Sequence, residues 1–211
     1  CSHGEKAFRA KQIYQWIWQK GVHSFDEMSN LSKGVREQLA AAFYFDNLRA
    51  GRIQTATDGT TKTAWELHDG QFVESVLIPG KNKYTVCVSS QVGCQLGCRF
   101  CATGTLGFKR NLSAGEIFDQ VVFAQKAAEE RGSTLSNIVF MGMGEPLLNY
   151  TNVLTAIKHI TDENGLAMSP YRITVSTAGI PEKIRQLAED EVRCNLAVSL
   201  HADKPDTRSR L

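Results

Sequence analysis

The sequence has no hydrophobic run long enough to cross a bilayer, little net charge and no low-complexity segment. A transmembrane helix needs about 20 consecutive apolar residues, and no stretch approaches that length. The polar, charged N-terminus does not have the form of a secretory signal. A net charge of +2 is too small to indicate nucleic-acid binding by itself. The 211 residues, 42% of them hydrophobic, predict an ordinary globular chain of one large domain or two small ones.

The chain also lacks the features of a disulfide framework and of a common zinc site. Three of its six cysteines, Cys94, Cys98 and Cys101, crowd one loop with Cx3Cx2C spacing, which indicates metal binding in a reducing cytoplasm. A zinc site usually closes with a second ligand pair, yet no second CxxC and no HxxxH occurs. Three thiolates suit three corners of a [4Fe–4S] cubane and leave one iron open for S-adenosylmethionine (SAM). A structural zinc ion is the less favoured alternative.

Residues 1–48 predict a small helical domain. Phe8, Ile13 and Ile17 follow helical spacing, and Gly21 is a plausible stop. Ser24 with Glu27 predicts a capping box, and Ser32 predicts a further N-cap. The Trp and Tyr side chains here are expected mainly in a core, with RNA contact by the basic face as the alternative.

Residues 49–82 change character, because Asp58-Gly59 and Asp69-Gly70 are hairpin signals that predict a three-stranded antiparallel β meander closed by Pro79-Gly80. From residue 83 to 211, strand and helix patterns alternate. Strands are predicted at 84–89, 138–141, 171–176 and 195–199. Helices are predicted from a Ser113/Glu116 capping box, from Thr151 and from Pro181. The fold class is therefore α/β with parallel strands, an incomplete (βα) barrel whose unusual loops gather at the strand C-termini.

Those loops carry the candidate site. Gly142-Met-Gly-Glu-Pro146 follows a strand directly, and its glycines permit close approach to a ligand, with Glu145 a natural partner for an ammonium group. Hydroxyls at Ser176 and Ser199 suit ribose or carboxylate oxygens, or else local capping. Phe100 could shield a cluster, stack on adenine or simply pack. Lys109 and Arg110 suit phosphate or a solvated surface equally.

Taken together, these motifs resemble the radical SAM ribosomal RNA adenine C2 methyltransferases, the RlmN/Cfr group. The resemblance covers essentially the whole chain, and its main segments are Cys87–Cys94, Cys98–Cys101, Gly107–Leu112, Met141–Asn149 and Ser199–Ala202. The long Met141–Asn149 segment favours the branch that methylates C2 of adenine in large-subunit (23S) rRNA and in tRNA over the C8-methylating branch.

The resemblance implies a role for each matching residue. Cys94, Cys98 and Cys101 would bind the [4Fe–4S] cluster. The residues that would contact SAM are Gly144, Glu145, Ser176, Ser199, Leu200 and His201. Glu74 would accept a proton, although strand alternation alone suggests a solvent-facing residue. Cys87 would resolve a covalent RNA–protein intermediate, although a buried strand cysteine is the alternative. In the implied mechanism, a C-terminal cysteine carries the methyl group that reaches C2, and the adenine must leave its stack.

The chain departs from the family pattern at its C-terminus, where the methyl-carrying cysteine is missing. Neither Cys194, expected in a core, nor the terminal Cys1 replaces it. A truncated chain that binds cluster and SAM without turnover is therefore expected. The implied partners are rRNA, tRNA and a reductant such as flavodoxin or ferredoxin, for a monomer in the cytoplasm without membrane contact. Two other functions are the alternatives: another radical SAM enzyme, such as a glycyl-radical activase, or a non-enzymatic, metal-bearing RNA-binding module.

Overall fold

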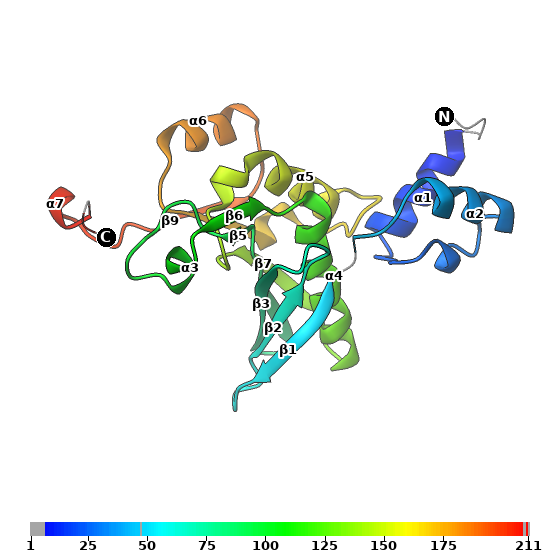
Figure 1. The fold of residues 1–211 in the computed structure, drawn as a ribbon, viewed down its shortest axis with the longest axis horizontal. Helices are drawn as coiled ribbons and strands as arrows, with labels where there is room; N and C mark the ends of the chain where they lie inside the picture. Colours follow the sequence, from blue (N-terminus) through cyan, green and yellow to red (C-terminus); the bar gives the residue numbers. More distant parts are fainter. Residues whose placement is uncertain (1–6, 47, 209, 211) are drawn as a thin grey trace.

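The computed structural model describes residues 7–46, 48–208 and 210 (Figure 1). Cys1 lies outside the described residues. The helical unit at the N-terminal end stands at one side of the molecule, the mixed α/β part occupies the middle, and the short helix α7 (Pro205–Arg208) lies at the other side (Figure 1).

The N-terminal unit contains α1 (Ala7–Trp18), the 3-10 turn η1 (Phe25–Glu27) and α2 (Lys33–Ala42). Gly21 ends the first helical segment with a φ of +58°, and the Ser32 side chain caps α2, as predicted. The predicted capping box at Ser24 is wrong, because Glu27 accepts a hydrogen bond from the backbone of His23 and only one short turn forms. The unit has its own small core of Val22, Met28, Leu31 and Val35.

The predicted meander is confirmed as β1 (Arg49–Thr55), β2 (Thr61–Glu66) and β3 (Phe72–Gly80). It does not stand alone, because β3 continues through Pro79 and pairs with β4 (Lys83–Cys87). The parallel strands β7 (Leu135–Phe140), β8 (Ile173–Thr177) and β9 (Asn195–Val198) follow in order. The result is one seven-stranded sheet, antiparallel at the meander and parallel from β4 onward, which confirms the expected α/β class.

Three helices, α4 (Ala114–Glu130), α5 (Tyr150–Thr161) and α6 (Pro181–Glu189), cover one face of this sheet (Figure 1). Alternate strand residues point into the resulting core, because successive side chains of a strand face opposite ways. The strand residues buried against the helices include Val73, Val86, Ile138, Phe140, Ile173 and Val175. Cys194 is partly buried and packs on this core, as expected.

Local signals predicted the helix starts with mixed success. The Ser113/Glu116 capping box of α4 is complete, and Pro181 opens α6. Thr151 is not an N-cap, because the 3-10 turn η2 (Pro146–Asn149) runs directly into α5 and puts Asn149 in the cap position.

Three elements that the sequence did not predict lie around the cysteine loop. Strands β5 (Gln91–Gly93) and β6 (Phe108–Asn111) form a hairpin, and α3 (Ala102–Thr105) is a short helix. The 3-10 turn η3 (Pro170–Arg172) and the short helix α7 were also not predicted. Within the part of the chain that the structure describes, no helix is both long and apolar enough to span a membrane.

Candidate functional site

The candidate residues gather on the sheet face opposite the helices, which we call the site face. Its strand positions are set by the register: Val76 pairs with Cys87, Cys87 with Val139, and Val139 with Thr174. Paired residues point to the same side, so this face carries Lys62, Glu74, Val76, Cys87, Val139, Thr174 and Ser176. The loops at the C-terminal ends of the parallel strands stand at the edge of the same face.

The cysteine loop is held at both ends. The β5–β6 hairpin closes its base, and the backbone N–H of Cys94 donates to the carbonyl of Gly107 over 3.3 Å. Gly93 allows this closeness, because a side chain there would collide with the Gly107 carbonyl. Cys94, Cys98 and Cys101 are free thiols of intermediate exposure. The loop therefore presents three thiols from one short, anchored segment.

The three thiols and Glu145 interact electrostatically. Burial is the largest cause that raises the pKa of Cys94, and negative charge at Cys98, Cys101 and Glu145 adds to it, against one backbone hydrogen bond from Leu96. A positive centre bound near Cys94 would offset this repulsion.

Glu145 is 4% exposed and joins two loops of the site. One carboxylate oxygen accepts from the N–H of Leu147 over 3.1 Å, and the other accepts from the N–H of Ala178 over 2.9 Å. Its own N–H donates to the side chain of Gln91. Neighbouring Gly144 has a φ of +100°, and a Cβ on it would lie 2.5 Å from the Cβ of Gln91. The glycine is thus required for the loop after β7 to close on β5.

The ends of β8 and β9 meet at their hydroxyls. Ser176 Oγ lies 3.3 Å from Ser199 Oγ, whereas Thr177 is buried and caps its own turn by accepting from the N–H of Gly179. His201 has a φ of +58°, and its ring centroid is 4.6 Å from that of the exposed Phe100. The first and last loops of the site are therefore in contact, and Leu200 beside them is exposed.

Glu74 and Cys87 lie on adjacent strands of the site face. Because Val76 is the register partner of Cys87, Glu74 is the diagonal neighbour of Cys87. Burial raises the pKa of the Cys87 thiol, partly offset by a hydrogen bond from the backbone of Met141. The Glu74 carboxylate forms an ion pair of 3.0 Å with Lys62, a residue that the sequence reading did not single out.

Arg110 is engaged in ion pairs within the protein and is not available to bind phosphate. Of the two alternatives for Lys109 and Arg110, phosphate binding or a solvated surface, the first is therefore excluded for Arg110. Its Nε donates to Asp69 over 2.6 Å, and its other nitrogens bind both carboxylate oxygens of the buried Glu116. The hydrogen bond and charge of Arg110 lower the pKa of Asp69 to about 2. Burial opposes ionisation of Glu116, but Arg110 and the Ser113 N–H outweigh it and keep that pKa below its usual range. Lys109 remains exposed.

The described residues contain no three His, Cys, Asp or Glu side chains that converge on a single metal ion. A structural zinc would require ligands about 2.3 Å from one centre, whereas cysteines of a cubane each bind a different iron. The donor set, three free thiols on one short loop, suits a cluster bound by three cysteines.

Two parts of the chain match known families. Residues 88–211 match the Radical SAM superfamily, and residues 1–44 match the ribosomal RNA large subunit methyltransferase N-terminal domain. The first match takes in the cysteine loop, the Gly144-Glu145 loop and both hydroxyl-bearing strand ends.

Curated relatives are similar over the whole chain. A probable dual-specificity RNA methyltransferase RlmN of Flavobacterium johnsoniae is 51% identical over 211 residues, 100% of this chain and 60% of the relative. One of the same description from Bacillus subtilis is 47% identical over 99% of this chain and 58% of its own length. The crystal structure of a radical SAM methyltransferase from Sphaerobacter thermophilus has a TM-score of 0.93 at 44% identity, covering 100% of this chain and 62% of that one. The chain thus spans about three-fifths of the length of these proteins.

Proposed function

Because the chain belongs to the radical SAM superfamily and, by its likeness over its whole length, to the RlmN group within it, we propose that the whole protein methylates C2 of adenine in large-subunit rRNA and in tRNA. The observation that carries this proposal is that the loops with the three cysteines, the buried Glu145 and the paired hydroxyls follow strands of one sheet, whose site face carries Glu74 and Cys87. The superfamily uses a [4Fe–4S] cluster and SAM, and the thiols of this chain fit that requirement.

Cys94, Cys98 and Cys101 would hold the cluster, which supplies the electron that cleaves SAM when both are bound. The remaining site residues would hold SAM beside it. The buried Glu145 carboxyl group accepts hydrogen bonds from two backbone N–H groups, and an ammonium group of the ligand would be a favourable neighbour for it. Gly144, the Ser176 and Ser199 hydroxyls, Leu200 and His201 would make the other contacts to SAM.

Glu74 would accept the proton that C2 of the adenine loses, and Cys87 would release the RNA from its covalent link to the protein. Their diagonal placement on adjacent strands supports this pairing, since both groups then act on one base. Burial raises the pKa of the Cys87 thiol, so the thiol reacts only once a base has taken its proton.

The helical unit is proposed to contact the RNA. Phe43 and Tyr44 at the end of α2 are exposed, Tyr44 by 82%, and offer flat surfaces for a base. A reductant of the flavodoxin or ferredoxin kind, a monomeric state and a cytoplasmic location belong to the same proposal.

The experiment supplies the whole protein with rRNA and tRNA transcripts, a reductant and methyl-labelled SAM, then digests the RNA for mass spectrometry. We expect 2-methyladenosine from the wild type and none from Cys98→Ala, with Lys81→Met as a control that retains full activity. A labelled methyl group at C8 or N6, or no labelled nucleoside at all, would contradict the proposal.

A further inference from the structure

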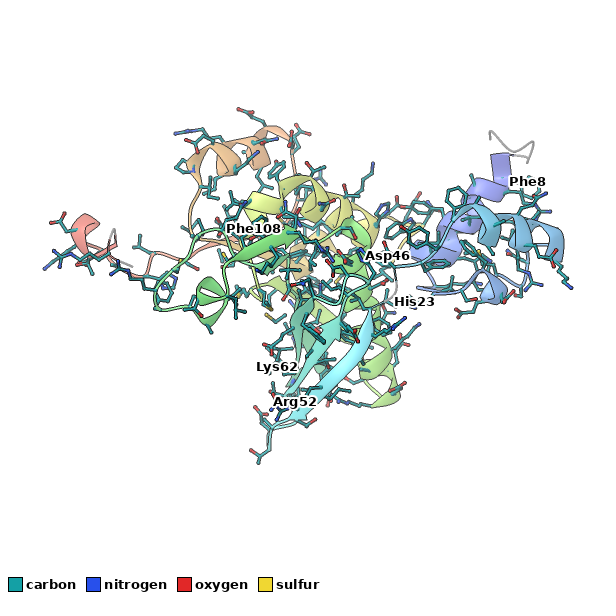
Figure 2. All side chains as sticks on the ribbon, viewed as in Figure 1. Phe8, His23, Asp46, Arg52, Lys62 and Phe108 are labelled. Carbon is teal, nitrogen blue, oxygen red and sulfur yellow. The ribbon has the colours of Figure 1, made fainter. Side chains whose placement is uncertain are left out.

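Lys62 forms an ion pair with Glu74, the proposed proton acceptor. Its Nζ lies 3.0 Å from Oε1 of Glu74, and both side chains keep some contact with solvent, at 42% and 46% exposure. Figure 2 labels Lys62 on the meander. The pair lies on the site face, where it has no part in the hydrophobic core.

The register of β2 and β3 explains how the two side chains meet. Ala64 is opposite Glu74, and Lys62 is opposite Val76, so Lys62 reaches Glu74 along the diagonal. The small side chain of Ala64 leaves that path clear. From the segment that follows β4, Ser89 Oγ donates to the backbone carbonyl of Glu74 over 2.5 Å. Glu74 is therefore fixed through its backbone on one side and through its carboxylate on the other.

An exposed ion pair contributes little to fold stability, because solvent screens it and two long side chains lose freedom. Its effect on a reacting group is different. A carboxylate that must reach one C–H bond depends on its orientation, and small displacements are costly to a rate. Lys62 occupies one oxygen of Glu74 and leaves the other for a proton.

We propose that Lys62 is a positioning residue that orients the Glu74 carboxylate for removal of the C2 proton, an inference that rests on the proposed function. In this step the C2–H bond breaks, its electron pair stays in the adenine ring, and the proton adds to the free oxygen of Glu74. Lys62 keeps all its own protons.

The test compares Lys62→Met, Lys62→Arg and Glu74→Gln in the whole protein, with Lys81→Met as the matched control. Lys81 is exposed in the turn between β3 and β4, so its substitution removes the same charge without touching Glu74. Single-turnover reactions are sampled for methylated product and for covalent RNA–protein adduct on denaturing gels, and RNA affinity is measured separately by filter binding.

We expect Lys62→Met to slow resolution of the adduct roughly tenfold, as a misplaced base does, with adduct accumulating and RNA affinity within about twofold of wild type. Lys62→Arg should restore most of the rate. The double variant Lys62→Met/Glu74→Gln should be no slower than Glu74→Gln alone, because both changes act on one group.

Three outcomes would overturn the role of Lys62. The first is a Lys62→Met protein that resolves the adduct at the wild-type rate. The second is a slower rate that is matched by a loss of RNA affinity, without accumulation of adduct, and the third is a double variant in which the effects of Lys62→Met and Glu74→Gln simply add. The second outcome would make Lys62 a phosphate contact instead. A wild-type protein that forms no C2-methyl product would contradict the proposed function itself, and this role with it.

Discussion

Arg110 shows at the scale of one residue what the sequence predicted and what it did not. The Gly107–Leu112 segment was recognised, but its arginine binds Asp69, which is 41 residues away in the chain, and Glu116. No local pattern contains that partner. Glu74 is a similar case: alternation correctly placed it on the face away from the helices, but its partner Lys62 became visible only through the β2–β3 register.

We predict that Arg110→Met lowers the free energy of unfolding by about 2–4 kcal/mol, since it removes the guanidinium group that binds both oxygens of the buried Glu116 carboxylate. Urea unfolding followed by circular dichroism measures this. Lys109→Met, the exposed neighbour, should change stability by less than about 0.5 kcal/mol. Equal effects of the two substitutions would contradict the assigned role.

The same cluster predicts a pH dependence. Asp69 has a folded-state pKa of about 2 against an ordinary value of 3.8, so the unfolded chain takes up its proton first as pH falls. The stabilisation is complete above pH 3.8 and is lost as pH falls towards 2. Because Asp69 keeps some solvent contact, the effect is moderate. The urea midpoint of wild type should fall between pH 5 and 3 by more than that of Arg110→Met; parallel pH profiles would contradict this.

Gly144→Ala should destabilise the loop after β7 for two reasons. An alanine at a φ of +100° is strained, and its Cβ would collide with Gln91. Together these cost about 2 kcal/mol or more. Gly70→Ala is the matched control, because Gly70 also has a positive φ, of +74°, but nothing lies within 4 Å of its Cβ position. Thermal unfolding of both variants separates collision from strain, and an equal loss in the two would argue against a close approach at Gly144.

At the scale of elements, hairpin turns were the reliable signal, because they depend on residues a few positions apart, whereas only one of the two predicted capping boxes forms. The Ser113/Glu116 box and both Asp-Gly turns are confirmed. Thr151 failed as a cap because a preceding 3-10 turn, started at Pro146, supplies the helix entry. The β5–β6 hairpin was missed because strands of three and four residues carry too little pattern, and their pairing depends on the loop they enclose.

The contact between α1 and α5 could not be predicted from either helix alone. The Trp18 ring stacks on His159 with centroids 3.8 Å apart, and the Tyr14 hydroxyl lies 2.9 Å from His159 Nδ1 while donating to Asp162 over 3.1 Å. Burial lowers the pKa of His159 below its ordinary 6.5, helped by Lys158 and opposed by Asp162. The neutral ring is therefore the form that the docked helices prefer.

We predict that docking of α1 on α5 weakens as pH falls below 6.5, because a folded-state pKa lower than the unfolded one makes stability decline with acid. Tryptophan fluorescence between pH 7.5 and 5.5 measures it. The change should be absent in Trp18→Phe and reduced in His159→Gln. A titration that is identical in wild type and His159→Gln would contradict this assignment.

At the scale of the whole molecule, the sequence predicted the order of the parts: a helical unit, a meander and a parallel βα region. It did not predict that the meander and the parallel strands form one sheet, since the β3–β4 pairing joins residues of two differently patterned regions. That single sheet is what places Glu74 on the same face as Cys87.

The most direct test of the central claim is electron paramagnetic resonance of the anaerobically reconstituted, reduced protein, recorded with and without SAM. We predict a reduced [4Fe–4S] signal that changes on addition of SAM and that is lost in Cys98→Ala. Bound zinc without sulfide, or a cluster signal indifferent to SAM, would contradict the open-iron site at Cys94, Cys98 and Cys101.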